Sequence, residues 1–364
     1  MAAAIVGPTF HLLLQDANGG PSNSDTAFAA LTFTAGSSDI SGTYSGSSGV
    51  LLTGGAAENL SGGTGTGSYS FPTLTSDTFT WNTSGGAYSV AADSASTPVA
   101  DFAVGVSPTS SANEQDPSIL VFVQAPASAP TITNTVWNAV GIQLNTSTGN
   151  TISSFTVDRT QITVSNTGSF TSTTSVNPNG AGAPTTPTAG PSGSSWTVAS
   201  DGSFAANSNG GPYTLGGAFS ASGNVLIGVD NYAGNNTPYL HFAVRQAAAG
   251  SAPTSLSGTY NAIQYAPSGP NGAGLTAYFV QVVFQSTRTW SVTGTANFKG
   301  TAIAVTGSGT YTIDSSGAFT LTTSGSGGNS WTGAISPDGN TAVLADLNND
   351  GAANNNGIIV AVHE

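Results

Sequence analysis

The stretch Gly309-Thr310-Tyr311-Thr312-Ile313-Asp314-Ser315-Ser316-Gly317-Ala318-Phe319 decides the fold class of this chain. Tyr311 and Ile313, and then Phe319 and Leu321, occupy alternate positions, which is the period of a half-buried strand. The Asp and Gly residues between them supply turn chemistry, because both residue types tolerate a positive φ. The stretch therefore predicts a β-hairpin.

The same hairpin pattern occurs three times along the chain. It returns as Ser195–Phe204 and, in a looser form, as Ser68–Phe79. The segment Gln124–Thr131 nearly recurs as Gln246–Thr254, and each copy follows a short apolar run. Repeats of ordinary domain size therefore divide the chain. We predict units 1–125, 133–247 and 256–364, joined by linkers 126–132 and 248–255.

The fold class follows from the strand signals and from the lack of helical ones. No stretch shows helical spacing for more than a turn or two, and the density of Gly and Thr opposes helix. We predict an all-β protein of three tandem antiparallel β-meander domains with seven or eight strands each. A meander of this size favours an up-and-down barrel, and a β-sandwich is the alternative.

Two segments between strands carry predictions of their own. Residues 171–194 of the second unit are rich in Thr, Pro and Gly, which predicts a long inserted loop. The two linkers are rich in Ala, Pro and Ser, and such segments act as semi-extended spacers. Spacers of this kind favour a rod or an array of domains, and the alternative is one body in which the three domains pack together.

The charge of the chain excludes two classes of partner. Its 364 residues include 17 acidic and only 4 basic side chains, for a net charge of −13. Nucleic acids and anionic membranes both attract basic residues, so neither is an expected partner. No apolar run reaches the roughly 18 residues of a membrane-spanning helix. The low charge and the abundance of Ser, Thr, Gly and Asn favour an extracellular or bacterial cell-surface location.

One loop carries oxygen ligands at the spacing of a calcium site. Asp346, Asn348 and Asp350 stand at its first, third and fifth positions, and Gly351 follows at the sixth. This pattern resembles the start of a calcium-binding loop. Gly357 stands where such a loop needs a bidentate Glu. We therefore weigh a structural calcium ion against a solvated Asn/Asp turn, which needs no metal.

The sequence predicts neither a catalytic centre nor a cofactor site. No Gly-x-Ser-x-Gly elbow follows a strand and opens a helix, and the chain has no cysteine. His11, His241 and His363 have no triad or metal-binding spacing. We expect the first two to be wall residues of strands and the third to be solvated. The protein is predicted to be no enzyme and to require no cofactor.

The third unit also resembles a known group of folds. Its opening Leu256-Ser257-Gly258-Thr259-Tyr260, followed by a strand meander, is similar to the start of lipocalin- or avidin-like barrels. In composition the chain resembles secreted bacterial surface-layer and adhesin proteins. The first resemblance implies a barrel fold but carries over no ligand, because the specific binding residues are lacking, and the second implies a surface protein.

These observations support three functional hypotheses. The first is a non-enzymatic extracellular or cell-surface structural or adhesive protein. It would assemble into fibres or arrays by self-association or bind a surface protein or glycan. The second is a small-ligand carrier, in which Tyr260, Tyr278 and Trp290 would line the third barrel and small inward residues would leave space. The third is a secreted hydrolase. The five tryptophans are expected in barrel cores rather than on sugar-stacking platforms.

Overall fold

The structure, a computed structural model, describes most of the chain. The described residues are 5–17, 24–37, 41–53, 56–59, 66–72, 78–82, 87–92, 101–106, 118–146, 152–178, 188–189, 194–207, 213–232, 239–268, 274–298, 301–325, 330–347 and 357–364. No helix in these ranges is long and apolar enough to cross a membrane.

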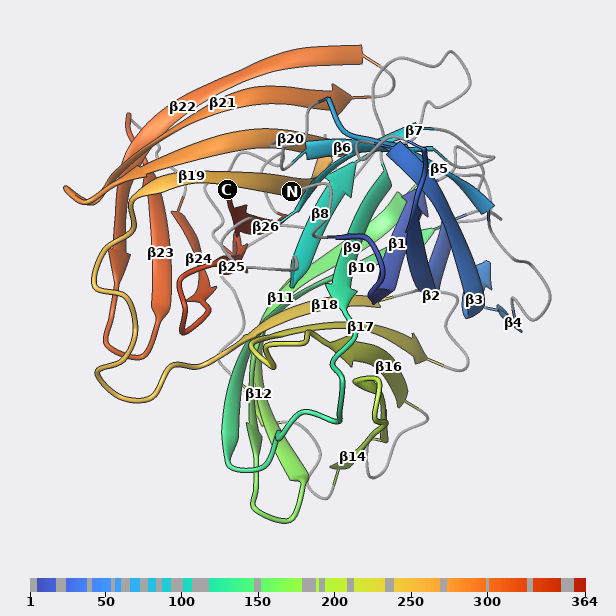
Figure 1. Ribbon diagram of the computed structural model, residues 1–364. Helices are drawn as coiled ribbons and strands as arrows, with labels where there is room; N and C mark the ends of the chain where they lie inside the picture. The colour runs from blue at the N-terminus through green and yellow to red at the C-terminus, as the bar shows by residue number, and fades with distance from the viewer. Residues whose placement is uncertain are drawn as a thin grey trace.

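The chain forms three closed, eight-stranded antiparallel barrels in sequence order (Figure 1). Barrel 1 consists of β1 (Thr9–Ala17), β2 (Ser24–Ala35), β3 (Ser41–Thr53), β5 (Thr66–Ser70), β6 (Thr78–Asn82), β7 (Ala87–Ala92), β8 (Phe102–Val106) and β9 (Ser118–Gln124), with β4 (Ala56–Asn59) added beside β3. Pairing of β1 with β9 and of β2 with β3 closes it. The prediction of barrels is confirmed, and the β-sandwich alternative is not adopted.

Barrels 2 and 3 repeat this order of strands. Barrel 2 consists of β10 (Thr135–Thr146), β11 (Ile152–Val164), β12 (Ser169–Pro178), β14 (Ser194–Val198), β15 (Ser203–Asn207), β16 (Tyr213–Phe219), β17 (Val225–Tyr232) and β18 (Tyr239–Arg245), with β13 (Thr188–Ala189) beside β12. Barrel 3 consists of β19 (Gly258–Ser268), β20 (Gly274–Gln285), β21 (Thr289–Phe298), β22 (Thr301–Ile313), β23 (Ala318–Thr323), β24 (Ser330–Ile335), β25 (Thr341–Ala345) and β26 (Ile358–His363).

The predicted hairpin lies between β22 and β23. Ile313 pairs with Phe319, and Gly317 has a φ of 88°, which a residue with a side chain adopts at a cost. The Asp314 carboxylate accepts hydrogen bonds from the backbone N–H groups of Ser316, at 2.8 Å, and Ala318, at 3.0 Å. The turn is therefore held by the residue types from which it was predicted.

Part of the predicted insertion in the second unit is regular structure. Strand β12 continues to Pro178 and pairs with β11 along that length. The predicted loop over residues 171–194 is therefore wrong for its first eight positions. Of its remaining positions, the described ones are β13 and the start of β14.

Each barrel has an apolar cluster in its interior, and the outer faces of the barrels form a fourth core that all three share. Strands alternate, so one set of side chains faces the barrel interior and the next set faces outward. The outward set of several strands is completely buried where the barrels meet. This common core includes Leu13, Val104, Val121, Val123, Val140, Ile142, Ile227, Leu240, Phe242, Ile263, Val343, Val360 and Val362.

The barrels meet in a cyclic order. The penultimate strand of barrel 1, β8, contacts the first and last strands of barrel 3, β19 and β26. The corresponding strand of barrel 3, β25, contacts β10 and β18 of barrel 2. Strand β17 of barrel 2 then contacts β1 and β9 of barrel 1. Each barrel therefore offers the same two surfaces to its neighbours.

Polar contacts join the segments that precede these penultimate strands. The Asp101 carboxylate accepts hydrogen bonds from the Ser222 backbone N–H at 2.9 Å and from its hydroxyl at 2.5 Å. Burial raises the pKa of Asp101, although both of these hydrogen bonds act to lower it. The Asn224 side-chain amide donates to Asp338 of barrel 3 at 2.9 Å.

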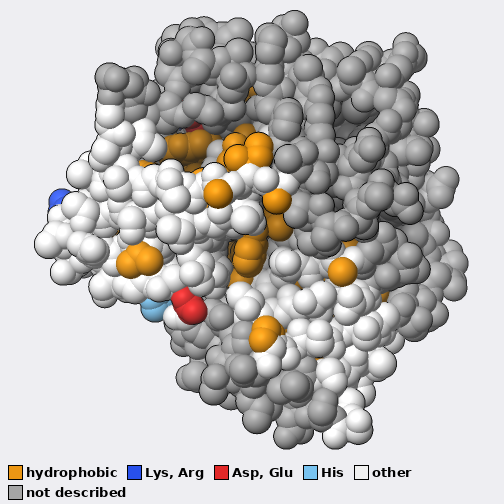
Figure 2. Space-filling view, turned by 90° about the horizontal axis from the view of Figure 1, so that it is seen from above, with side chains coloured by type: hydrophobic (Ala, Val, Ile, Leu, Met, Phe, Trp, Pro, Cys, Tyr) orange, Lys and Arg blue, Asp and Glu red, His pale blue; other side chains and the backbone are white. Residues whose placement is uncertain are grey.

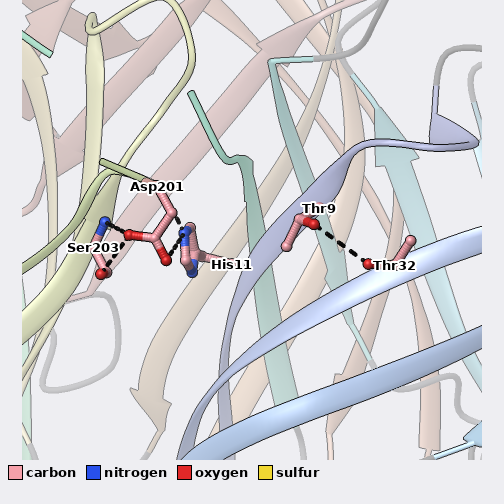
Figure 3. A network of polar contacts seen from close by, with 5 residues as sticks. All are labelled: Thr9, His11, Thr32, Asp201 and Ser203. Atoms are coloured by element: carbon pink, nitrogen blue, oxygen red, sulfur yellow. Dashed lines mark hydrogen bonds and ion pairs between the residues drawn. The ribbon is translucent and has the colours of Figure 1, made fainter. Parts of the chain in front are cut away.

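A histidine joins barrels 1 and 2 (Figure 3). His11 points outward from β1 and is 3% exposed. Its Nε2 donates to the Asp201 backbone carbonyl at 2.8 Å and lies 3.9 Å from the Asp201 carboxylate. The His11 ring also stacks on Phe28 at 5.7 Å between ring centroids. His11 is therefore a wall residue, as predicted, and its wall is the interface between two barrels.

The linkers lie against the barrels that follow them and do not act as spacers. In the first linker, Pro126 lies beside Gly202 and Pro130 beside Gly223, both of which are hairpin residues of barrel 2. In the second linker, Pro253 lies beside the hairpin residue Gly339 of barrel 3 in the same way. The structure therefore shows three barrels packed in one body, which is the alternative to the rod or array that the composition of the linkers favours.

Candidate ligand site

A plug of aromatic rings closes one end of barrel 3. Tyr260, Phe284, Tyr311 and Phe319 are buried there, and neighbouring rings lie 5.1–5.8 Å apart. Leu256, which directly follows the second linker, is 4% exposed and belongs to the same cluster. This end of the barrel is therefore a solid floor.

The hydroxyl of Tyr311 ties the linker to this floor. It accepts a hydrogen bond from the Leu256 backbone N–H at 2.8 Å. The backbone carbonyl oxygens of Leu256, at 3.0 Å, and Gln285, at 2.9 Å, lie within reach of its single proton. The side chain of Tyr311 is 2% exposed, so water does not replace these bonds.

Tyr311→Phe is expected to lower the free energy of unfolding by about 1–3 kcal/mol, because it leaves the Leu256 N–H buried without its acceptor. Urea unfolding measures the loss. Tyr278→Phe is the matched control, since Tyr278 is half-buried above the floor. An equal loss in both variants would contradict the assigned role of Tyr311.

Above the floor, barrel 3 contains an apolar cavity of about 250 Å³. Its lining consists of Ala262, Gln264, Tyr278, Val280, Val282, Phe284, Trp290, Val292, Val305, Thr306, Gly307, Phe319, Leu321, Thr323, Trp331, Ala342, Leu344, Ile359 and Ala361. None of these residues is charged. Tyr260, Tyr278 and Trp290, which the carrier hypothesis needs on the inside, do point inward, the first in the floor and the other two in the cavity wall.

Two facing alanines leave this space. Ala262 of β19 pairs with Ala361 of β26, and both side chains are buried in the interior. At the corresponding position of barrel 1, Leu12 of β1 pairs with Phe122 of β9. The Phe122 ring packs 6.1 Å from Phe33 and so fills the centre of that barrel. In barrel 3 two alanines stand in place of this Leu and Phe, and both line the cavity.

One side of the cavity wall ends where β22 extends past β23. Strand β23 pairs only with the Gly309–Ile313 segment of β22, whereas β21 pairs with β22 from Thr301 to Thr310. In the segment that β23 leaves uncovered, Val305 lines the cavity and Ile303 is 47% exposed. Figure 2 shows hydrophobic side chains gathered in a recess of the surface. An apolar molecule would therefore meet exposed apolar side chains beside the cavity.

Two polar side chains face the cavity from neighbouring strands. Tyr278 pairs with Gln264 across β20 and β19. Burial raises the pKa of Tyr278, so its hydroxyl keeps its proton near neutral pH and can donate a hydrogen bond. The arrangement can hold an apolar body and bind one or two polar atoms at a fixed place.

The predicted calcium ligands are not assembled by the described residues. Asp346 follows β25, is completely buried, and its backbone N–H donates to the Gly357 carbonyl at 3.0 Å. Asn348 and Asp350 lie outside the described residues. Within the described ranges, no three His, Asp or Glu side chains come together as metal ligands. Calcium at this loop stays a prediction.

The remaining site predictions concern histidines and tryptophans. All five tryptophans are at most 9% exposed, so their placement in cores is confirmed. His363 is half-buried, with its ring 4.7 Å from that of Tyr260, which corrects the expectation that it is solvated. His241 faces the interior of barrel 2, with its ring 4.2 Å from that of Tyr239, whose hydroxyl donates to Asp158. Sequence reasoning missed this group, because Asp158 and Tyr239 are 81 residues apart and match no motif.

The sequence matches no known protein-family model and no curated protein. Three solved structures show a distant likeness. A protein of unknown function from Nostoc punctiforme is 9% identical with a TM-score of 0.22, and the match covers 67% of this chain and 97% of that one. Kievitone hydratase from Nectria haematococca is 8% identical with a TM-score of 0.21, covering 67% and 91%. Transferrin binding protein B from Haemophilus parasuis is 9% identical with a TM-score of 0.23, covering 98% and 76%.

Proposed function

We propose that this protein is a non-enzymatic carrier that binds one small apolar molecule inside barrel 3. The observation that carries the proposal is the apolar cavity of about 250 Å³ above the aromatic floor. Eight-stranded barrels have room for one small ligand when their interior side chains are small. Apolar cavities of roughly 150 Å³ bind benzene or xenon.

The lining defines the class of ligand. Ligand pockets for drug-sized molecules span roughly 300–1,000 Å³, so this smaller cavity suits one or two rings or a short chain. Tyr278 and Gln264 supply a donor and an amide for one polar atom. The described lining contains no charged side chain, which suits an uncharged, mainly apolar ligand.

The extracellular or cell-surface location remains part of the proposal and rests on composition. With 4 basic residues in 364, the chain offers few sites to proteases that cleave after Lys or Arg. The structural and adhesive alternative, with self-association or a surface protein or glycan as partner, is favoured by a rod of domains, whereas the three barrels pack in one body. We therefore favour the carrier.

The test gives barrel 3 the pair of large interior side chains that barrel 1 has at the corresponding position. Naphthalene is the probe, and quenching of tryptophan fluorescence reports its binding, because Trp290 and Trp331 line the cavity. The double variant Ala262→Leu/Ala361→Phe is expected to bind naphthalene at least tenfold more weakly than the original protein, since the new side chains occupy the cavity.

The matched control places the same side chains in barrel 2. Ala139 pairs with Ala243 at the corresponding position, so Ala139→Leu/Ala243→Phe adds the same volume elsewhere and should leave the affinity unchanged. Circular dichroism checks that each variant is folded, and the single variant Ala361→Leu replaces the double one if that does not fold. Unchanged naphthalene affinity in the folded barrel 3 variant would refute the proposal.

A further inference from the structure

One interior row of side chains differs in character among the three barrels. The strand registers place corresponding residues at the same height in each. In barrel 1 the members of this row whose side chains the structure describes are Phe79, Val90, Gly105 and Leu120. In barrel 3 it reads Phe319, Gly333, Leu344, Ile359, Gln264, Tyr278. In barrel 2 it reads Phe204, Gly217, Gly228, His241, Gly141, Asp158. Barrel 2 alone combines an acid, a histidine and three glycines.

Asp158 is completely buried in this row. The Thr160 hydroxyl donates to its Oδ1 at 2.8 Å, and the Tyr239 hydroxyl donates to its Oδ2. The Thr174 hydroxyl lies 2.9 Å from that of Thr160 and continues the network into β12. The carboxylate therefore accepts hydrogen bonds from two hydroxyl groups, one on its own strand β11 and one on β18.

Glycine allows these side chains to converge. Gly141 pairs with Asp158 on one side and with His241 on the other. A methyl group at Gly141 would overlap with Asp158 Oδ2 and would lie 2.8 Å from Tyr239 Cε2. Gly228 borders His241 from the other side. The Tyr239 and His241 rings lie 4.2 Å apart at 38° and form an aromatic wall beside the acid.

No positive charge balances this carboxylate among the described residues of barrel 2. The Arg159 guanidinium lies on the outer face and donates to the Thr332 hydroxyl of barrel 3 at 2.9 Å. Burial lowers the pKa of His241 to about 4, so the imidazole is neutral near pH 7. A buried acid without a countercharge has its pKa raised, to about 7 for Asp158.

We propose that the interior of barrel 2 is a second binding site, which takes a small organic ammonium ion. The ammonium group binds the Asp158 carboxylate, and the carbon chain lies along the glycine-bordered row beside Tyr239. An ammonium group supplies the missing positive charge and can also contact the face of a tyrosine ring. This site is separate from the apolar cavity of barrel 3.

Calorimetric titration with n-butylammonium chloride tests the site, with 1-butanol as the uncharged probe of similar size. The original protein is expected to bind n-butylammonium at least tenfold more tightly than 1-butanol. Asp158→Asn is expected to weaken n-butylammonium binding at least tenfold. Asp314→Asn is the matched control, since it removes a carboxylate from an exposed turn. The affinity of this variant for n-butylammonium should equal that of the original protein.

A second variant covers the case in which Asp158→Asn does not fold. Gly228→Leu introduces the residue that barrel 3 has at this position, Leu344, and is expected to block binding while Asp158 remains. Equal binding of the two probes, or unchanged ammonium binding in either folded variant, would overturn the proposal. Naphthalene binding in barrel 3 should persist in both variants. The proposal for barrel 2 can therefore be refuted without refuting the proposal for barrel 3, and the reverse.

Discussion

Phe242→Ala is expected to lower the free energy of unfolding by about 3–5 kcal/mol, the usual cost of removing a buried phenylalanine side chain. Phe242 points outward from β18 and is 0% exposed in the common core. Strand β18 contacts β25 of barrel 3 there. The cavity left by the substitution therefore lies between barrels.

The location of that cavity predicts coupling among the barrels. Urea unfolding gives the loss in stability, and hydrogen exchange shows where protection is lost. We expect faster exchange in β25 of barrel 3 and in β8 of barrel 1 as well as in β18 itself. The control is Val283→Ala, because Val283 also points outward from its barrel but is 39% exposed. This control should change stability by about 0.5 kcal/mol or less.

Faster exchange confined to barrel 2 would contradict the view that the barrels stabilise one another. The common core would then be a contact surface between domains that fold separately. Loss of protection in all three barrels would instead show that the shared core acts as one cooperative unit.

The second large effect is a pH dependence of stability that appears only when one partner of the Asp158 and His241 pair is removed. Burial raises the pKa of Asp158 from 3.8 to about 7 and lowers that of His241 from 6.5 to about 4. Between about pH 4 and 6.5, the unfolded pair holds one proton, on His241. The folded pair also holds one, on Asp158. Folding then moves no net proton, so this pair adds no slope.

Each single variant should reveal the slope of the other group. In Asp158→Asn, the folded state binds fewer protons than the unfolded state because His241 is neutral. Stability should therefore rise by about 3 kcal/mol as the pH rises from about 4 to 6.5. In His241→Ile, the folded state retains the Asp158 proton. Stability should therefore fall by about 4 kcal/mol as the pH rises from about 4 to 7.

Urea unfolding at several pH values measures these slopes relative to the original protein. Asp314→Asn serves as a control in which a carboxylate is removed outside barrel 2. Hydrogen bonds from Ser316 lower the pKa of Asp314, so its ionised carboxylate stabilises the fold above the acidic range. The Asp314→Asn variant should lack that stabilisation near neutral pH, and its pH profile should differ in slope from that of the original protein only in the acidic range. Parallel pH profiles for the original protein and Asp158→Asn would contradict the burial of an ionisable acid in the barrel.

The local features of the fold could be predicted from the sequence, whereas its assembly could not. The turn from Asp314 to Gly317 and the alternation of Tyr311 and Ile313 depend only on neighbouring residues. The linker prolines have the composition of a spacer, yet they pack on glycines more than 70 residues away. One signal was present: the unbroken apolar run Ile119–Val123 indicates a strand buried on both faces.

The candidate sites show the same division. Tyr278 and Trp290 could be assigned to an interior because strand alternation fixes the direction of their side chains. The space beside them depends on the pairing of Ala262 with Ala361, and these residues are almost a hundred positions apart. The row that contains Asp158 and His241 likewise becomes visible only through the registers of five strand pairs.

The cyclic contact order has a consequence for higher assembly. Each barrel contacts one neighbour through its penultimate strand and the other neighbour through its first and last strands. An interface between two different surfaces of repeated units is a heterologous interface. Such an interface produces a filament when its rotation does not close and a ring when it does. Here the third barrel returns to the first, so every copy of both faces is already occupied within one chain. A fourth barrel cannot be added through this surface, and polymers built from the protein would need a different one.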